Sequence, residues 1–168
     1  MIIHKECEKD FEIINNLVKN AFKTAKVSNG KEQDFVNELR NSEDYIPELA
    51  LVAIDNNFIL GHIMLTKTYI FDKNKNFETL FLGPVSVDLN YRNKGIGSKL
   101  INVCLEKALE LGYGSVVLVG DPEYYSRFGF VSSTNFGIKH IMDIPEQFVL
   151  AKELFPNSLN GCKGLIKR

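Results

Sequence analysis

Cysteine is scarce in this sequence, and its three residues are scattered at positions 7, 104 and 162. They form no CxxC pair and cannot all be bonded to one another, which is typical of a protein that works in a reducing compartment. Long apolar runs are also missing, so we expect no segment to cross a bilayer. Charged residues at positions 4 to 6 interrupt the start too early for a signal peptide. We therefore predict a cytoplasmic protein with no membrane partner.

A strong charge of either sign is absent as well. The 168 residues carry a formal net charge of -1, which exerts no overall pull toward nucleic acid. Hydrophobic residues make up 45% of the chain and charged residues 24%, which are ordinary values for a folded globular protein. The length suits one sizeable core. We predict a single domain spanning residues 1–168 and no nucleic-acid partner.

One local absence is more informative. No acidic residue occurs between Asp88 and Glu106, where the stretch YRNKGIGSKL joins an apolar strand-like run to an amphipathic run. The first turn of a helix normally favours acids, because its unpaired N–H groups and dipole are positive there. Here Arg92, Lys94 and Lys99 crowd the same place. We infer that the missing anion is a ligand.

The remaining patterns predict an alternation of strands and helices. Helical spacing of apolar residues indicates helices at 10–22, 33–40 and 98–111, and a short helix or turn at 122–128. Apolar or alternating runs predict strands at 1–4, 48–55, 58–71, 77–87, 115–120, 129–131, 148–155 and 163–168. We expect a hairpin turn at Asn56-Asn57, a helix C-cap at Gly112, and irregular structure over 132–147. The result is a mixed α/β domain whose N-terminal part is antiparallel.

Two nucleotide-binding motifs fit the GIG stretch poorly. A Walker loop needs GxxxxGK followed by Ser or Thr, and GIGSKL has another order. A dinucleotide fingerprint needs a third glycine, where this chain has Leu100, and a ribose-binding acid roughly 20 residues further on, where it has Ser115 and Val116. A flexible surface loop is the remaining plain explanation for an isolated GxG.

The whole run from Leu82 to Phe130 carries a more specific pattern. LGPVSV, RNKGIG, an amphipathic helix, a buried strand and YYSRFGF follow one another. This order resembles the GCN5-related N-acetyltransferase (GNAT) superfamily, within it the bacterial acetyltransferases with an LGP strand and a YYxRFGF ending. The resemblance implies an acyl-CoA N-acyltransferase fold, in which a mixed central sheet with splayed middle strands is flanked by helices.

The resemblance also implies the binding residues for acetyl-CoA as cosubstrate. The loop Arg92, Asn93, Lys94, Gly95, Ile96, Gly97 and Ser98 would hold the pyrophosphate, mainly through backbone N–H groups that the glycines leave accessible. The main chain of Val85, Ser86 and Val87 would pair with the pantetheine arm and the thioester carbonyl. Pro84 cannot donate a ladder hydrogen bond, which indicates a bulge or a departing neighbour strand at Gly83-Pro84.

Tyr125 lies four residues before Gly129, as the family's tyrosine does, and the resemblance makes it the acid that protonates the departing sulfur. No general base is evident, since the position at which some family members use a glutamate is Phe81 here. The asparagine that the family frequently has seven residues before the tyrosine is replaced by Leu118. Glu78, Asp121, Glu123 or an ordered water remain open. The three histidines show no metal-ligand spacing, so we predict no metal.

We therefore predict direct acetyl transfer to a primary amine of an unidentified acceptor, either a small molecule or a peptide. Acids at positions 32, 34, 38, 43 and 44 could attract a cationic amine, but a solvated helix face is the preferred explanation for them. A homodimer is left open. The alternative function is a CoA-binding sensor or regulatory module without turnover.

Overall fold

The computed structural model describes residues 1–25 and 28–168. Its helices are α1 (Phe11–Ala21), α2 (Glu32–Arg40), α3 (Ile96–Glu110) and α4 (Pro122–Tyr125). Its strands are β1 (Ile2–Lys5), β2 (Tyr45–Asp55), β3 (Phe58–Asp72), β4 (Lys75–Val87), β5 (Ser115–Val119), β6 (Val131–Ser132), β7 (Ile138–His140), β8 (Val149–Glu153) and β9 (Gly164–Ile166). Short 3-10 turns are η1 (Glu8–Asp10), η2 (Phe22–Thr24), η3 (Leu89–Tyr91), η4 (Ser126–Phe128), η5 (Ser133–Phe136) and η6 (Glu146–Phe148).

The strands form one mixed sheet in the order β1-β2-β3-β4-β5-β8-β6, and β9 pairs with both β3 and β7. The pairs β4–β5 and β7–β9 are parallel, whereas β1–β2, β2–β3, β5–β8 and β6–β8 are antiparallel. The predicted mixed α/β architecture is therefore confirmed. The chain divides into two compact units, residues 1–66 with 83–107, and residues 67–82 with 108–168.

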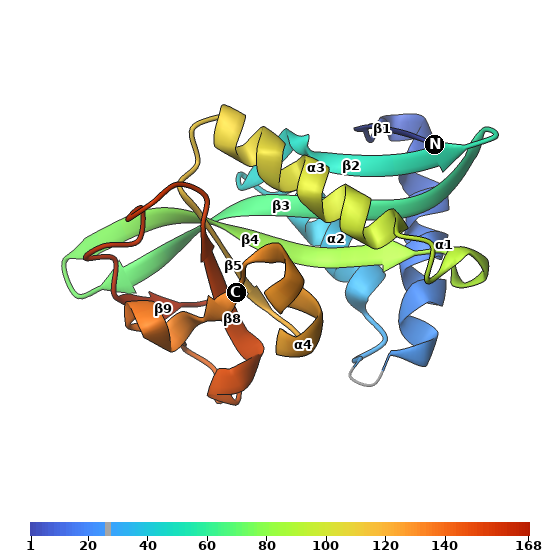
Figure 1. Ribbon diagram of the computed structural model, residues 1–168. Coiled ribbons are helices and arrows are strands. Elements are labelled where there is room, and N and C mark those ends of the chain that lie inside the picture. The colour runs from blue at the N-terminus through green and yellow to red at the C-terminus, as the bar shows by residue number, and fades with distance from the viewer. Residues whose placement is uncertain (26–27) are drawn as a thin grey trace. The chain divides into compact units, whose positions relative to one another are not determined.

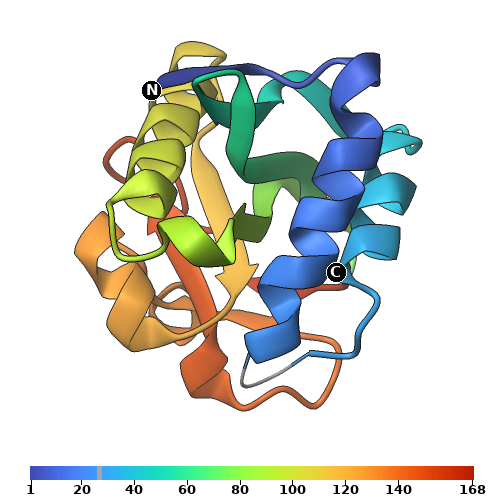
Figure 2. The ribbon, with the colours of Figure 1, turned by 90° about the vertical axis from the view of Figure 1, so that its right-hand side faces the viewer.

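In the first unit, helices cover both faces of the strands. Figures 1 and 2 show α1 and α2 on one face of β2 and β3, and α3 on the other. The α1/α2 face is closed by a cluster of Ile14, Val18, Val36, Leu39, Ala50, Val52 and Met64. On the opposite face, a Cβ added at Gly61 would meet Leu100 and Ile96 of α3 at 2.8 and 3.0 Å. The absence of a side chain at Gly61 thus lets α3 approach the sheet closely.

In the second unit, β5 is the central strand. It pairs with β4 through Leu80–Val116 and Phe81–Val117, and with β8 from Ser115–Glu153 to Val119–Val149. Four of its five residues are buried, which is the reason its sequence is a continuous apolar run. The sheet is extended by β9, which contacts β3 at Phe71–Leu165 and lies parallel to β7.

Most local predictions agree with the structure. Asn56 and Asn57 have φ of 49° and 65°, the left-handed pair of a tight hairpin turn, and Gly112 has φ 94° after α3. Several predicted bounds were wrong, including those of the strands predicted at 48–55 and 129–131, which the structure has as Tyr45–Asp55 and Val131–Ser132. The third predicted helix begins at Ile96 rather than Ser98, and the segment 132–147 is not irregular throughout, because it contains η5 and strand β7. No helix in the described part of the chain has the length and apolar character needed to cross a membrane.

Candidate active site

The loop before α3 has the geometry of an anion site. The Lys99 N–H donates to the Gly95 carbonyl at 3.0 Å, so the helix ladder starts at Gly95 and the N–H groups of the first turn have no partner within the helix. No acid lies in that turn. Asn93 and Gly95 have φ of 62° and 80°, and alternation of this kind turns successive N–H groups toward one concave side. A phosphate-sized anion is the natural ligand of such a helix start.

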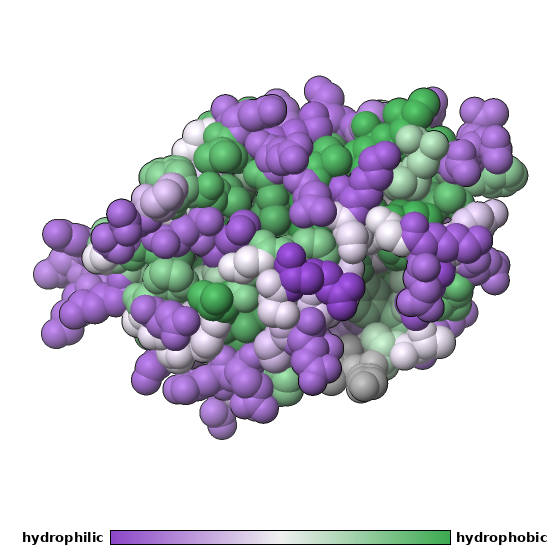
Figure 3. Space-filling model, viewed as in Figure 1, coloured by the Kyte–Doolittle hydropathy of each residue, from purple (hydrophilic) through white to green (hydrophobic). Residues whose placement is uncertain are grey.

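The same loop is open to solvent and positively charged. Residues 92–95 are exposed, Gly97 and Ser98 are half-buried, and Ile96 is 5% exposed and anchors the helix start in the core. Lys94 Nζ lies 5.2 Å from the centre of the Tyr91 ring. Hydrophilic side chains gather over this loop in Figure 3. The loop therefore offers both accessible backbone donors and cationic side chains.

Arg92 does not stand free beside the loop. Its guanidinium donates to the Ala21 carbonyl at 2.6 Å and to Thr24 Oγ1 at 2.9 Å, so it binds the C-terminal end of α1 and the turn that follows. A cation is favourable there, because the last carbonyls of a helix lack partners and carry the negative end of its dipole. Arg92 thus joins the loop before α3 to the end of α1, a use that the motif alone does not indicate.

The strand segment 85–87 ends β4 within the first unit. Val85 and Val87 are half-buried, whereas Ser86 is 2% exposed. The Asp88 N–H donates to the Leu60 carbonyl at 2.8 Å, which sets the register between β3 and the end of β4. The Gly83–Pro84 bond that precedes the segment is cis. Among the described residues, the ladder of β4 with β5 consists of Leu80–Val116 and Phe81–Val117 alone.

Tyr125 belongs to the second unit and lies at the end of α4. Its ring packs edge-on against Tyr124 at 5.0 Å and against Phe130 at 5.9 Å, and a Cβ added at Gly120 would meet it at 2.7 Å. Burial raises the pKa of its hydroxyl above the ordinary value of 10, with smaller contributions from Tyr124 and Asp121. The hydroxyl therefore stays protonated through neutral pH and can donate. Tyr124 instead stacks with the Arg127 guanidinium at 4.7 Å.

The first unit thus brings together all the predicted binding residues from Val85 to Ser98, and Tyr125 is described separately with the second unit. Two of the acids considered as bases have other partners. Glu78 Oε2 lies 3.7 Å from Lys67 Nζ, and Asp121 caps α4 by accepting from the Glu123 N–H at 3.0 Å. Phe81 and Leu118 lie in the core of the second unit.

Sequence reasoning missed a buried polar cluster in the first unit. The side chain of Glu6 accepts from Arg40 Nε at 2.7 Å, Arg40 Nη2 at 3.0 Å and the Tyr45 hydroxyl at 2.8 Å, and its Oε1 lies 2.8 Å from His62 Nε2. Burial alone would raise the pKa of Glu6, but hydrogen bonds from His62 and Arg40, together with the positive charge of Arg40, outweigh it and lower the pKa to about 2. The carboxylate is therefore ionised at neutral pH.

The four members of this cluster come from distant parts of the chain. Glu6 follows β1, Arg40 ends α2, Tyr45 begins β2 and His62 lies in β3. Each is an isolated polar residue in the sequence, and no motif joins them. The one available signal was His62 within the apolar run 58–71, because a histidine buried in such a strand requires a hydrogen-bond partner.

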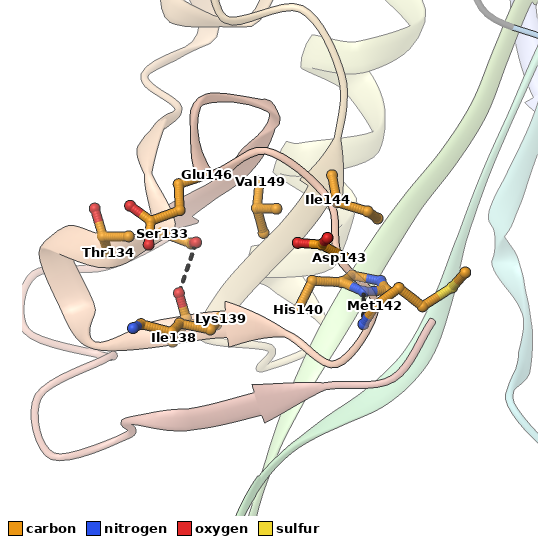
Figure 4. A pocket seen from close by; sticks show the side chains of 10 residues that line it. All are labelled: Ser133, Thr134, Ile138, Lys139, His140, Met142, Asp143, Ile144, Glu146 and Val149. Carbon is orange, nitrogen blue, oxygen red and sulfur yellow. Dashed lines mark hydrogen bonds between the residues drawn. The ribbon is translucent and has the colours of Figure 1, made fainter.

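A hollow of about 190 Å³ opens in the second unit between η5, β7 and the segment before β8. Figure 4 shows His140 and Asp143 on one side of it and Glu146 near Ser133 on the other. Both ring nitrogens of His140 are used, because Nδ1 accepts from the Met142 N–H at 3.0 Å and Nε2 bonds to the Arg168 carbonyl. The two exposed carboxylates leave this hollow able to receive a cation or a hydrogen-bond donor.

Comparisons with known proteins agree with this geometry. Residues 3–132 match the family model for the acetyltransferase (GNAT) domain. The uncharacterised N-acetyltransferase YhbS of Escherichia coli is 29% identical over 168 residues, which is 99% of this chain and 95% of that protein. The crystal structure of YhbS from Escherichia coli in complex with CoA has a TM-score of 0.86 at 26% identity, and the match covers 99% of this chain and 88% of that one.

A second solved structure extends the likeness. A GNAT-family acetyltransferase from Brucella melitensis in complex with acetyl-CoA has a TM-score of 0.81 and 29% identity, with coverage of 99% of this chain and 94% of the other. More distant solved structures with TM-scores near 0.63, among them the ribosomal-protein-S18-alanine N-acetyltransferase from Escherichia coli, share the fold alone. The family model covers most of the chain, from β1 to β6 and including the whole loop before α3. The chain therefore belongs to the GNAT family of acetyltransferases.

Proposed function

We propose that this enzyme transfers the acetyl group of acetyl-CoA directly to a primary amine of a small molecule or peptide. The observation that carries the proposal is the start of α3, where N–H groups without a partner in the helix, cations and an absence of acids coincide. Two relatives of similar length and fold were solved with CoA and acetyl-CoA, which supports the same cosubstrate here. A cytoplasmic location and a single domain over residues 1–168 remain predictions.

In this proposal the backbone from Asn93 to Ser98 holds the pyrophosphate, and Lys94 adds a charge-assisted contact. Arg92 holds the loop against α1 and reaches the phosphates only if it leaves Ala21. The main chain of residues 85–87 aligns the pantetheine arm, and one N–H there stabilises the oxyanion as the amine attacks the thioester carbon. Tyr125 then gives its proton to the departing CoA sulfur.

Isothermal titration with acetyl-CoA tests the binding half of the proposal. Gly97→Val should abolish binding while the protein stays folded, because the branched side chain fills the space of the pyrophosphate. Gly97 is the better position, since the positive φ of Gly95 would strain any replacement. Acetyl-CoA at a hundredfold excess over its dissociation constant should stabilise the wild type by about 2.7 kcal/mol. Unchanged affinity in folded Gly97→Val would remove the loop from the site.

Two lysines, one in the loop before α3 and one in the last turn of α3, provide a matched test of charge. Lys94→Ala should weaken acetyl-CoA binding, and more so at low salt, because salt screens exposed charges. Lys107, in the last turn of α3, should be silent when replaced by Ala. Release of CoA thiol with pooled amines tests turnover. If the protein binds acetyl-CoA but releases no CoA thiol with any amine in the pool, it would be a sensor rather than an enzyme.

A further inference from the structure

His62 differs from the other two histidines in how its ring nitrogens are used. His140 uses both nitrogens on main-chain groups, and His4 is exposed with Nδ1 at 2.8 Å from the Lys5 carbonyl. His62 is 0% exposed, binds Glu6 through Nε2, and keeps Nδ1 buried without a partner among the described residues. A buried nitrogen left unpaired costs free energy, so a functional reason is worth seeking.

The carboxylate of Glu6 decides which nitrogen of His62 carries the proton. An ionised carboxylate can only accept hydrogen bonds, and Glu6 Oε1 lies 2.8 Å from Nε2. Nε2 is therefore the N–H, and in the neutral ring Nδ1 holds the free lone pair. A histidine fixed in one tautomer by a buried carboxylate, with the other nitrogen basic and free, has the arrangement of a proton acceptor.

The register of the strands places this nitrogen on the face that Ser86 also occupies. The Asp88 N–H donates to the Leu60 carbonyl, and from antiparallel pairing in this register we infer that His62 lies opposite Ser86, two residues further along each strand. Gly61 faces α3, hence its neighbour His62 faces α1 and α2, as Met64 does in the core cluster. Side chains opposite one another on neighbouring strands share a face and lie within reach. Ser86 Oγ, like His62 Nδ1, is buried and without a partner among the described residues.

We propose that Ser86, His62 and Glu6 form a proton relay that removes the proton of the acceptor amine during acetyl transfer. The inference rests on the proposed function, which puts the main chain of residues 85–87 beside the thioester. Ser86 is the member that meets the amine, and His62 and Glu6 are positioning residues behind it. The relay closes by a change of the Ser86 rotamer or through one water, since the two groups are not bonded in this structure.

The proton balance of the step is complete. As the amine nitrogen bonds to the acetyl carbon, its proton passes to Ser86 Oγ and the hydroxyl proton passes to His62 Nδ1. The carbon–sulfur bond breaks, and the thiolate takes its proton from Tyr125. Glu6 stabilises the imidazolium while it exists, and the charged groups that face it are Glu6 and Arg40, with the Tyr45 hydroxyl beside them. His62 and Tyr125 then recover their original states by exchange with solvent.

Three substitutions separate the relay from a structural role. His62→Gln keeps an N–H that can donate to Glu6 but removes the basic nitrogen. Ser86→Ala removes a hydroxyl that bonds to nothing in the described structure, so stability should hold or rise. Thr66→Val is the matched control, because Thr66 Oγ1 is equally buried and unpartnered but lies further along β3, opposite Tyr45 of β2.

The experiment measures acetyl-CoA affinity by calorimetry, turnover by thiol release, and the pH dependence of kcat/KM with an amine that stays neutral across the range. His62→Gln and Ser86→Ala should bind acetyl-CoA as the wild type does, yet turn over roughly 10²–10⁴-fold more slowly, the scale of general base catalysis. His62→Gln should also differ from the wild type in the pH dependence of kcat/KM, because the proton acceptor of the relay is gone. Thr66→Val should leave all three measurements unchanged.

The outcomes are distinguishable. If the wild type transfers acetyl groups and both variants match it in rate and pH profile, the relay is wrong and the acetyltransferase proposal stands. If the wild type binds acetyl-CoA but releases no CoA thiol with any amine tested, the acetyltransferase proposal fails and the relay fails with it. Nitrogen-15 NMR of His62 gives an independent answer without turnover. The Nε2–H tautomer is expected, and an Nδ1–H tautomer would overturn the relay, because Nδ1 could not then accept a proton.

Discussion

At the scale of single residues, Tyr125 offers the sharpest test of the chemistry. Its ring is held by Tyr124, Phe130 and the close approach of Gly120, and Tyr125→Phe preserves all of these contacts. Melting temperature and acetyl-CoA affinity should stay near wild type, while turnover falls roughly 10²–10⁴-fold through loss of the acid. Because burial raises the pKa of this hydroxyl, the wild type should not lose activity to tyrosine ionisation at neutral pH. Tyr124→Phe is the control and should be nearly silent.

Single positions differ in how far the sequence predicts them. The left-handed turn at Asn56-Asn57 and the cap at Gly112 were predicted correctly, because backbone conformations of this kind have few compatible residues. The donation of Arg92 to Ala21 was not predictable, since it joins groups 71 positions apart through tertiary packing. The Glu6–His62 pair, 56 positions apart, was missed for the same reason. The roles of the loop residues and of Tyr125 stay predictions.

At the scale of elements, the approach of α3 to β3 depends on Gly61. A methyl group there would lie 2.8 Å from Leu100 Cδ1 and 3.2 Å from the Ser86 carbonyl. Gly61→Ala should therefore destabilise the protein by about 1–3 kcal/mol, the usual cost of overpacking a core. Urea denaturation measures this change. In a Leu100→Ala background the added methyl should cost less, and equal costs in the two backgrounds would show that α3 does not restrict this position.

Elements with a strong periodic pattern were predictable, and those sustained by partners were not. The helices α1 and α2 and the strands β2, β3 and β5 follow from apolar spacing. Strand β7 has three residues and exists because it pairs with β9, which a local pattern cannot reveal. The start of α3 at Ile96 was missed by two residues. Glycine and cations in and before its first turn are not the residues that usually mark the start of a helix, although they suit a turn that binds an anion.

At the scale of the whole molecule, ionisation of Glu6 should make the free energy of unfolding depend on pH. Its pKa is lowered from an ordinary 4.5 to about 2 in the folded protein, so the folded state holds the ionised form more tightly than the unfolded chain does. The stabilisation is present above pH 4.5 and is lost as the pH falls toward 2. Its size is about 3 kcal/mol, from roughly 1.4 kcal/mol for each pH unit between the two values.

Denaturation by urea between pH 7 and pH 2.5 measures this dependence. Glu6→Gln should be less stable than wild type at pH 7, because a neutral amide leaves Arg40 buried beside it without its charge partner. The difference between the two proteins should shrink as the pH falls, since protonation of Glu6 brings the wild type toward the same loss. Asp55→Asn is the control, because Asp55 is an exposed carboxylate at 3.7 Å from the N-terminal amine and should contribute little. A gap between wild type and Glu6→Gln that stays constant from pH 7 to pH 2.5 would mean that ionisation of Glu6 is not what stabilises the fold.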